Sequence, residues 1–272
     1  MSVENLDFSV LDLPQNQKIL NIFKTSVNTL SCNSALNLLK QECINGCILS
    51  YNEKLDEVFR NILVPKKIIE FTGHFECSTP VCFRLCVTVQ MPKTHGGCGG
   101  EAFYISTNSN FSIDKLKEVA TEFFEEYPNI LEEFNVEYIL DHIYYTKVIN
   151  PLEFTACLYK LERILQQKEI RLLIVDSISY ILRQLDGTER FKLTNKVIQL
   201  LRYLSIKYNL CVIITNFCTT RIDGDKAYIT ASFGDSFYHL VNSRFSFTRI
   251  SNDIQVKVAK SLIVNEKETV II

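Results

Sequence analysis

The feature that most constrains the fold is an alternation between short apolar runs and longer segments with helical spacing. Five runs are rich in β-branched or apolar side chains, at residues 68–71, 102–105, 142–145, 172–175 and 211–214. Helical patterns fill most of the gaps between them, at residues 81–89, 113–127, 152–167 and 191–208. Continuous apolar strands separated by helices are typical of βαβ units, whose parallel sheet is covered on both faces. The pattern predicts an α/β fold with a mostly parallel central sheet.

The two ends of the chain depart from this pattern. Residues 244–248 and 254–258 alternate apolar and polar side chains, which predicts an antiparallel edge at the C-terminal end of the sheet. Residues 1–33 are rich in Asn and weakly amphipathic, and are too short for a domain. We therefore expect a helical arm or linker over residues 1–33 and one core domain over residues 34–272.

The composition excludes several classes of protein. The chain has 272 residues, of which 47% are hydrophobic, and only 9 Gly and 6 Pro, so it is not intrinsically disordered. Its 29 Lys and Arg nearly cancel its 31 Asp and Glu, which argues against a strongly basic nucleic-acid binder, although a neutral total can conceal a local basic patch. The 10 Cys in a chain without an apparent secretory signal or membrane span predict reduced thiols in the cytosol or nucleus.

The first predicted strand ends at Gly73, and the next seven residues precede an apolar helix. A phosphate-binding loop of the form G-x-x-x-x-G-K-[ST] occupies this place in nucleotide-binding proteins. In this frame Ser78 replaces the second glycine, Thr79 the lysine and Pro80 the hydroxyl residue that binds magnesium. Glu76 adds negative charge where a triphosphate would lie. Taken alone, the stretch also fits an ordinary connection between a strand and a helix.

Asp176 follows the fourth apolar run directly. Ligands of open α/β sheets bind at the carboxyl ends of the strands, and a carboxylate there commonly holds Mg²⁺ in nucleotide sites. An aspartate after a strand also serves as a turn or helix-capping residue. Both interpretations stay open on this residue alone.

Several stretches resemble, in the same order, the eukaryotic RecA-family recombinases. They are residues 69–73, 89–92 with 96–102, 172–177 and 214–216. Residues 139–145, 219–223 and 34–39 followed by Gly46 are most similar to the C-type paralogues of the strand-exchange recombinase, including a short insect form without a complete N-terminal helical domain. The resemblance covers about residues 32–250 and implies a RecA-like P-loop NTPase core.

The resemblance also implies a DNA-dependent ATPase site, from which most catalytic groups are missing. The position of the family's catalytic glutamate is Asn108, which can position a water but cannot accept its proton. The glutamine that senses the γ-phosphate in the family is Phe217, so only Asp176 remains of the hydrolytic set. We therefore expect a pseudo-ATPase with negligible hydrolysis. Binding of ATP and Mg²⁺ at an interface with a partner subunit stays open.

DNA contacts in this family come from loops after the fourth and fifth strands. The matching segments are residues 183–190 and 220–228. The side chains that can reach phosphates or bases are Arg183, Arg190, Arg221, Lys226 and Tyr228. Both segments also contain acids, so ordinary solvated loops are the alternative.

Self-assembly in this family uses a linker Phe-x-x-Ala whose ring enters the neighbouring core. The aligned stretch here begins with Cys32 and ends with Ala35. Replacing Phe by Cys removes about 1–3 kcal/mol of apolar burial. We therefore expect no long homofilaments, and heteromeric pairing with other recombinase paralogues instead.

Two His-x-x-Cys pairs, His74 with Cys77 and His95 with Cys98, have a spacing reminiscent of zinc sites. The resemblance already accounts for both stretches as loops of the fold. We therefore expect no metal site there.

These observations lead to one functional hypothesis and two alternatives. The chain is expected to act in homologous-recombination repair of DNA double-strand breaks, including meiotic recombination, in the nucleus and also the cytoplasm. It would be an architectural subunit that assembles with other paralogues and promotes recombinase filaments on single-stranded DNA. The alternatives are an active DNA-dependent ATPase with an unorthodox phosphate loop and a scaffold without a nucleic-acid role.

Overall fold

The computed structural model describes residues 34–37, 40, 46–95, 97–108, 110–128, 134–224, 226–264 and 268–272. Contacts divide the chain into two units, Met1–Ile44 and Asn45–Ile272. In the first unit residues 35–37 are helical. The arm predicted over residues 1–33 lies outside the described residues. Nothing in the described part is long and apolar enough to form a membrane-spanning helix.

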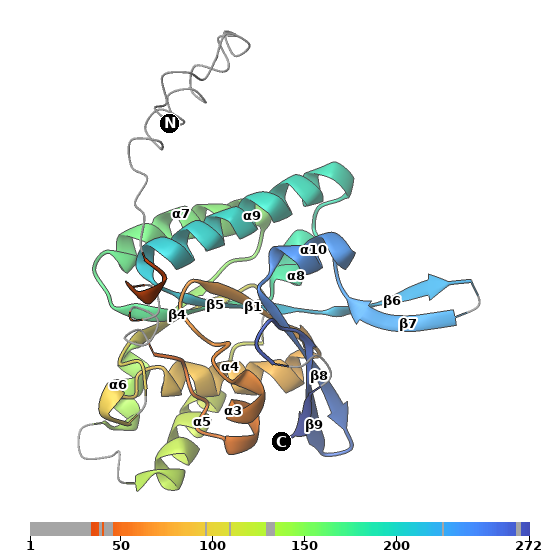
Figure 1. Cartoon of the computed structure of the whole chain (residues 1–272). Coiled ribbons are helices and arrows are strands. Elements are labelled where there is room, and N and C mark those ends of the chain that lie inside the picture. Colours follow the sequence, from red (N-terminus) through yellow and green to blue (C-terminus); the bar gives the residue numbers. More distant parts are fainter. Residues whose placement is uncertain are drawn as a thin grey trace, which may run out of the picture. The chain divides into compact units, whose positions relative to one another are not determined.

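The second unit is built on an eight-stranded sheet (Figure 1). Its strand order is β10-β9-β8-β1-β5-β4-β2-β3. The strands are β1 (Lys67–Gly73), β2 (Glu101–Ser106), β3 (Ile143–Lys147), β4 (Ile170–Asp176), β5 (Cys211–Asn216), β8 (Ser243–Ile250), β9 (Asp253–Lys260) and β10 (Thr269–Ile271). β1 to β5 pair in parallel and β9 and β10 antiparallel, which confirms the predicted α/β sheet with an antiparallel C-terminal edge. β8 differs from the prediction because it runs parallel to β1.

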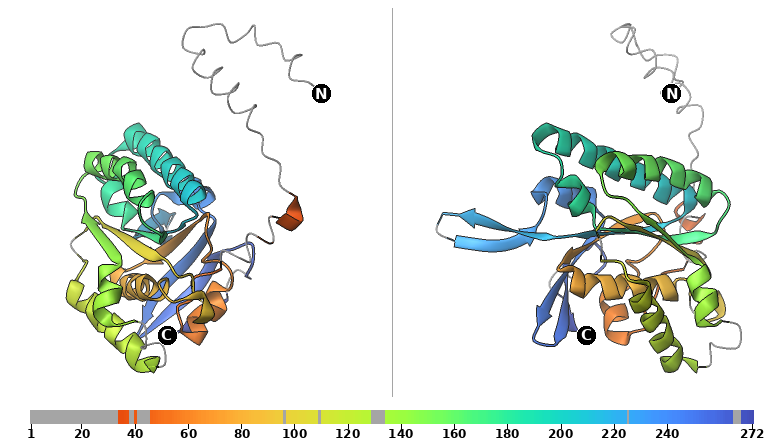
Figure 2. Two further views of the ribbon diagram at one scale, coloured as in Figure 1. Left: turned by 90° about the vertical axis from the view of Figure 1, so that its left-hand side faces the viewer. Right: turned by 180° about the vertical axis from the view of Figure 1, so that it is seen from behind.

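Helices cover both faces of the sheet (Figure 2). One layer contains α3 (Glu53–Phe59), α4 (Phe75–Thr88), α5 (Ile113–Glu126) and α6 (Val136–Asp141). The other contains α7 (Pro151–Leu165), α8 (Ile178–Leu182), α9 (Gly187–Tyr208) and α10 (Gly234–Leu240). A short 3-10 helix, η3 (Lys93–His95), precedes β2. Along β4, Leu172 and Ile174 join the first core while Leu173 and Val175 join the second. Since successive side chains of a strand point to opposite faces, a sheet buried on both faces requires the continuous apolar runs seen in the sequence.

Two helices and one predicted loop also differ from the sequence-based expectation. Helix α4 begins at Phe75 rather than at residue 81, and α9 begins at Gly187 rather than at residue 191. The segment predicted as a loop after β5 forms a two-stranded hairpin of β6 (Cys218–Asp223) and β7 (Lys226–Ala231). An Asp-Gly pair flanked by β-branched residues is a strong hairpin signal, so the hairpin was predictable.

Candidate nucleotide-binding edge and nucleic-acid hairpin

The carboxyl ends of the parallel strands bring the predicted nucleotide-site residues to one edge of the sheet. Gly73 ends β1 and Asp176 ends β4, while Asn108 lies two residues past the end of β2. Strands β1, β5, β4 and β2 are consecutive neighbours in the sheet. Residues far apart in the sequence therefore meet where ligands of α/β sheets bind.

Helix α4 fills the place of a phosphate loop. It begins at Phe75, so Ser78, Thr79 and Pro80 are all helical. The N–H of Ser78 donates to the carbonyl of His74 at 3.4 Å. Backbone N–H groups that are committed to helical hydrogen bonds cannot cradle a phosphate. Pro80, expected in a first helical turn, lies in the second turn of α4, where it is exposed and supplies no N–H.

Gly73 is explained by strand packing. Its φ is +146°, and a Cβ added there would lie 2.2 Å from the carbonyl oxygen of Phe247 on the paired strand β8. Only glycine fits so close an approach of two backbones. This position therefore requires glycine whether or not a phosphate binds.

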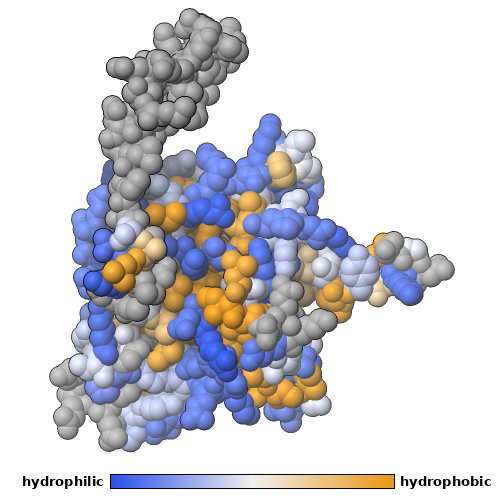
Figure 3. Space-filling model, in the orientation of Figure 1, coloured by the Kyte–Doolittle hydropathy of each residue, from blue (hydrophilic) through white to orange (hydrophobic). Residues whose placement is uncertain are grey.

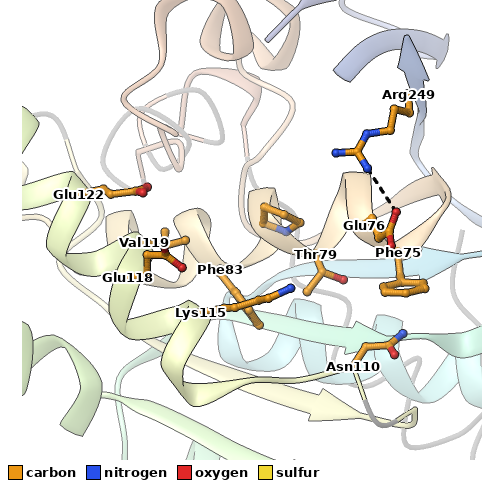
Figure 4. A pocket seen from close by; sticks show the side chains of 11 residues that line it. Phe75, Glu76, Thr79, Phe83, Asn110, Lys115, Glu118, Val119, Glu122 and Arg249 are labelled. Carbon is orange, nitrogen blue, oxygen red and sulfur yellow. Dashed lines mark hydrogen bonds and ion pairs between the residues drawn. The ribbon is translucent and has the colours of Figure 1, made fainter. Parts of the chain in front are cut away.

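A cavity of about 480 Å³ lies between α4 and α5 at this edge (Figure 4). Figure 4 shows the amine of Lys115 directed toward Thr79, and an ion pair joins Glu76 to Arg249 at 3.4 Å. The charged residues of its lining are Glu76, Lys115, Glu118, Glu122 and Arg249. Acids outnumber bases here, which disfavours a triphosphate.

Asp176 is fully engaged by hydroxyl groups. Its Oδ1 accepts from Thr215 at 2.6 Å, and its Oδ2 accepts from Thr79 at 3.1 Å and Tyr104 at 2.5 Å. The carboxylate is buried, with 1% exposure. Burial, together with the Asp176 charge, raises the pKa of Tyr104 well above its ordinary value. Sequence reasoning missed Tyr104 and Thr215, because only strand register reveals that they flank Asp176.

This set of residues does not fit Mg²⁺ with ATP. Magnesium needs oxygen ligands in octahedral geometry, usually one or two carboxylates together with phosphates and waters. Here both oxygens of Asp176 are held by hydroxyls, and Pro80 stands at the hydroxyl position.

Asn108 is buried, with 8% exposure. Its Oδ1 accepts from the N–H of Asn110 at 3.3 Å, and its backbone carbonyl accepts from Ser106 Oγ at 2.7 Å. Its Nδ2 has no hydrogen-bond partner among the described residues. Asn108 therefore sits at the edge predicted for it, but an amide supplies no general base.

The position of the family's phosphate-sensing glutamine lies at the base of the hairpin. The carbonyl of Phe217 accepts from the N–H and Oγ of Ser232, at 3.0 and 2.6 Å. Asn216 Nδ2 donates to the carbonyl of Ser232 at 3.1 Å. Arg183, a candidate DNA contact, donates to Ser232 Oγ and to the carbonyl of Cys218. These bonds fasten the two ends of the hairpin and occupy the Arg183 guanidinium.

The other predicted DNA loop, residues 183–190, is mostly helix ends. Arg183 is the C-cap residue that follows α8, and α9 begins at Gly187. Arg190 donates through Nε to the carbonyl of Leu185 at 2.7 Å and through Nη2 to Asp186 at 2.9 Å. The structure thus uses both arginines of this segment for internal contacts.

The hairpin projects beyond the helix layers and has two different faces (Figure 1). The cross-strand pairs Arg221 with Tyr228 and Asp223 with Lys226 place the three candidate DNA-contacting residues on one face. Ile222 and Ile229 lie on the opposite face, and each is 78% exposed. Figure 3 shows hydrophobic atoms among hydrophilic ones on the projection.

The assembly residues are only partly described. Cys32 lies outside the described residues, and Ala35 is an exposed helical residue. A groove of about 560 Å³ lies between β3 and α7, which sequence reasoning did not identify. β3 is the last strand of the sheet order, so no strand of the described part covers its outer edge.

The His-x-x-Cys pairs have no metal-site geometry in the described part of the chain. His74 and His95 are exposed, whereas Cys77 and Cys98 are buried. Burial raises the pKa of Cys98 to about 11, which disfavours a thiolate ligand. The described residues contain no group of three His, Cys, Asp or Glu able to hold a metal.

Comparison with known proteins places the chain among recombinases. It is 33% identical over 230 residues to "DNA repair protein RAD51 homolog 3" of Cricetulus griseus, covering 79% of this chain and 63% of that protein. It is 28% identical over 228 residues to the protein of the same name in Dictyostelium discoideum, covering 78% of this chain and 60% of that protein. It is 27% identical over 238 residues to "DNA repair protein RAD51 homolog 2" of Homo sapiens, covering 76% and 62%.

The chain spans somewhat less than two thirds of the length of these relatives. A family model described as Rad51 matches residues 41–272, which include the whole sheet and both helix layers. The chain therefore belongs to the Rad51 family, a family of eukaryotic RecA-type recombinases and their paralogues.

Proposed function

We propose that this protein acts in homologous-recombination repair of DNA double-strand breaks, including meiotic recombination, as an architectural subunit rather than an ATPase. It pairs with other recombinase paralogues and promotes recombinase filaments on single-stranded DNA, in the nucleus and also the cytoplasm. The observation that carries this proposal is helix α4, which begins at Phe75 and so makes Ser78, Thr79 and Pro80 helical. Membership of the family and its relatives among DNA repair proteins support the biological role.

Glu76 supports the loss of ATPase activity. Its carboxylate lies in the first turn of α4, where a helix N-terminus attracts anions, and it is paired with Arg249. This internal anion disfavours binding of a phosphate at the start of α4. ATP at an interface would be held by the neighbouring subunit, with this chain completing the site from outside.

We expect this chain to hydrolyse no ATP, whether it is assayed alone or together with a paralogue and single-stranded DNA. Lys115 is the test position, because its amine points into the cavity beside Thr79 and its side chain is exposed. Lys115→Gln should leave turnover unchanged, as should Lys117→Gln on the same helix. Turnover that exceeds the paralogue's own and falls only with Lys115→Gln would establish the active ATPase instead.

The groove between β3 and α7 supports the partner role. Its lining is largely apolar, and includes Phe103, Tyr144, Ala156, Cys157, Leu161 and Ile164. The open edge of β3 offers backbone groups to an added strand. In this chain Cys32 stands at the position of the linker phenylalanine. The chain can therefore bind a neighbour's linker phenylalanine in its groove, but it has no such ring to insert into a neighbour. Such a subunit pairs with a different paralogue and does not extend a homofilament.

Ala156→Trp is expected to weaken capture of a partner paralogue at least tenfold, because Ala156 is a small exposed residue that lines the groove. Gln199→Trp on the exposed side of α9 is the matched control and should bind normally. Binding is measured by co-purification and titration. Equal binding by both variants would reject this groove, and concentration-dependent homofilaments in sedimentation would reject the heteromeric subunit.

A further inference from the structure

The near-neutral charge of the chain conceals a separation between the two helix layers. α9 carries one acid, Glu189, against five cations, namely Arg190, Lys192, Lys196, Arg202 and Lys207. α5, in the other layer, carries two lysines against five acids, namely Asp114, Glu118, Glu122, Glu125 and Glu126. α3 and α6 are acidic as well. Figure 2 shows the two layers on opposite faces of the sheet. Positive charge therefore gathers along α9, while α7 beside it is neutral, with two acids and two bases.

Three of these cations share one line along α9 with a tyrosine. Lys192, Lys196, Tyr203 and Lys207 follow each other at intervals of four, seven and four residues, which places them on one side of a helix. All four are exposed. Lys196 Nζ lies 5.6 Å from the ring centre of Tyr159 on α7. We call these five residues the basic stripe.

Two lysines of the basic stripe keep their charge available. Lys207 pairs with Glu162 of α7 at 2.6 Å, and Glu162 also accepts from Tyr203 at 3.0 Å. Lys192 and Lys196 form no ion pair within the described part of the chain. Because α9 rises about 1.5 Å per residue, the stripe is about 22 Å long.

Aromatic rings lie beside these charges. Tyr159 is 55% exposed and Tyr203 is 47% exposed. Neither ring belongs to the hydrophobic core. Helices α7 and α9 contribute other side chains to that core, namely Leu158, Leu161, Val197 and Leu201. Exposed rings beside cations form the combination that binds single-stranded nucleic acid, in which cations neutralise phosphates and rings stack on bases.

We propose that the basic stripe binds single-stranded nucleic acid. Lys192 and Lys196 contact phosphates, and the ring of Tyr159 lies against a base. The stripe is made by the outer sides of two helices and shares no residue with the hairpin or the carboxyl edge of the sheet. It stands independently of the proposed function, because loss of this binding leaves pairing through the β3 groove intact.

The tyrosines favour nucleic acid over the other polyanionic occupants. An acidic protein segment, or the acidic α5 layer of a second copy, would be attracted by the lysines alone. A duplex would likewise engage the lysines through its backbone, with its bases already stacked. Only a single strand has free base faces for the rings.

The experiment measures binding of the full chain to a fluorescein-labelled oligo-dT strand by anisotropy at several salt concentrations. Lys192→Gln with Lys196→Gln should weaken binding about tenfold at low salt and reduce the salt slope by about 1.4, the share of two phosphate contacts on a single strand. Lys93→Gln with Lys117→Gln makes the same charge change at exposed residues outside the basic stripe and should leave binding within about twofold. The proposal is overturned if the wild type does not bind oligo-dT. It is also overturned if the stripe variant keeps the salt dependence of the wild type, or if the control variant loses as much affinity as the stripe variant.

Tyr159 separates stacking from charge. Tyr159→Leu should weaken binding about fivefold or more, the loss expected from one stacked base, and Tyr159→Phe should bind as the wild type does. Equal behaviour of the two variants overturns base stacking. The proposal is rejected if a duplex or polyglutamate competes as strongly as unlabelled oligo-dT does. It is also rejected if the chain self-associates in a salt-sensitive way that the lysine variant abolishes, because the basic stripe would then bind a second copy.

Discussion

Replacing Asp176 by alanine is expected to lower the free energy of unfolding by about 3–9 kcal/mol, because it orphans three buried hydroxyls at about 1–3 kcal/mol each. These hydroxyls belong to Thr79, Tyr104 and Thr215, from three different elements. Since domains of this kind have a total stability of about 5–15 kcal/mol, the variant should lose much of its resistance to denaturant. Urea unfolding followed by circular dichroism measures the loss.

The control for this variant is Asp114→Ala, which removes an exposed acid from the first turn of α5 and should cost less than about 1 kcal/mol. Thr215→Val removes one of the three donors and should fall between the two variants. A loss below about 1 kcal/mol for Asp176→Ala would contradict a structural role. Stabilisation of the wild type, but not of Asp176→Asn, by Mg²⁺ with ATP would make the carboxylate a ligand-binding group.

Replacing Glu70 by glutamine is expected to destabilise the fold by about 3–5 kcal/mol, because it leaves a buried cation without its partner. Glu70 lies in the centre of β1 with 0% exposure, and it accepts from Arg244 Nε at 2.6 Å and Asn216 Nδ2 at 2.7 Å. Arg244 is itself only 8% exposed. Asn216 also holds the carbonyl of Ser232 at the hairpin base, so the variant should increase hydrogen exchange in the hairpin.

The opposite variant, Arg244→Met, should show a dependence on pH that Glu70→Gln lacks. Burial raises the pKa of Glu70 above its ordinary 4.5, against the opposing effect of Arg244. Without Arg244 the folded state holds a proton on Glu70 at a higher pH than the unfolded chain does. Glu70 therefore contributes stability to Arg244→Met that is fully present below pH 4.5 and is lost as the pH rises through the raised pKa.

The midpoint of urea unfolding, measured at several pH values from below 4.5 upward, tests this pH dependence. The double variant Glu70→Gln with Arg244→Met should lie within about 1–2 kcal/mol of the wild type, because it removes both charges together. Additive losses in the double variant would show that the pair is not coupled.

The assembly of the sheet was predictable because each of its central strands carries its own signal. The runs at β1, β2, β4 and β5 are mostly apolar and are buried at successive positions, as a parallel sheet covered on both faces requires. The parallel placement of β8 beside β1 was not predictable. The alternation of apolar and polar residues along β8 indicates which side chains are buried. It does not indicate whether the neighbouring strand runs parallel or antiparallel to β8.

The location of the candidate site was predictable, but the conformation and hydrogen bonding of its residues were not. The positions of Gly73, Asn108 and Asp176 follow from the ends of strands. That Ser78 and Thr79 are helical does not follow, since the same residues in a loop would leave their N–H groups available. The hydroxyls around Asp176 also escaped prediction, because they come from residues 79, 104 and 215 and meet only through strand register.

By itself, the sequence determined the fold class, the family and the absence of the catalytic lysine and glutamate, because local periodicity and residue identity carry those properties. Only the tertiary structure decided that Ser78 and Thr79 belong to helix α4, that Asp176 is a buried acceptor and that the charges of α9 and α5 lie on opposite faces of the sheet. These depend on which distant residues face one another across strands and helices. A near-zero sum of charges holds no information about the side of the sheet on which each charge lies.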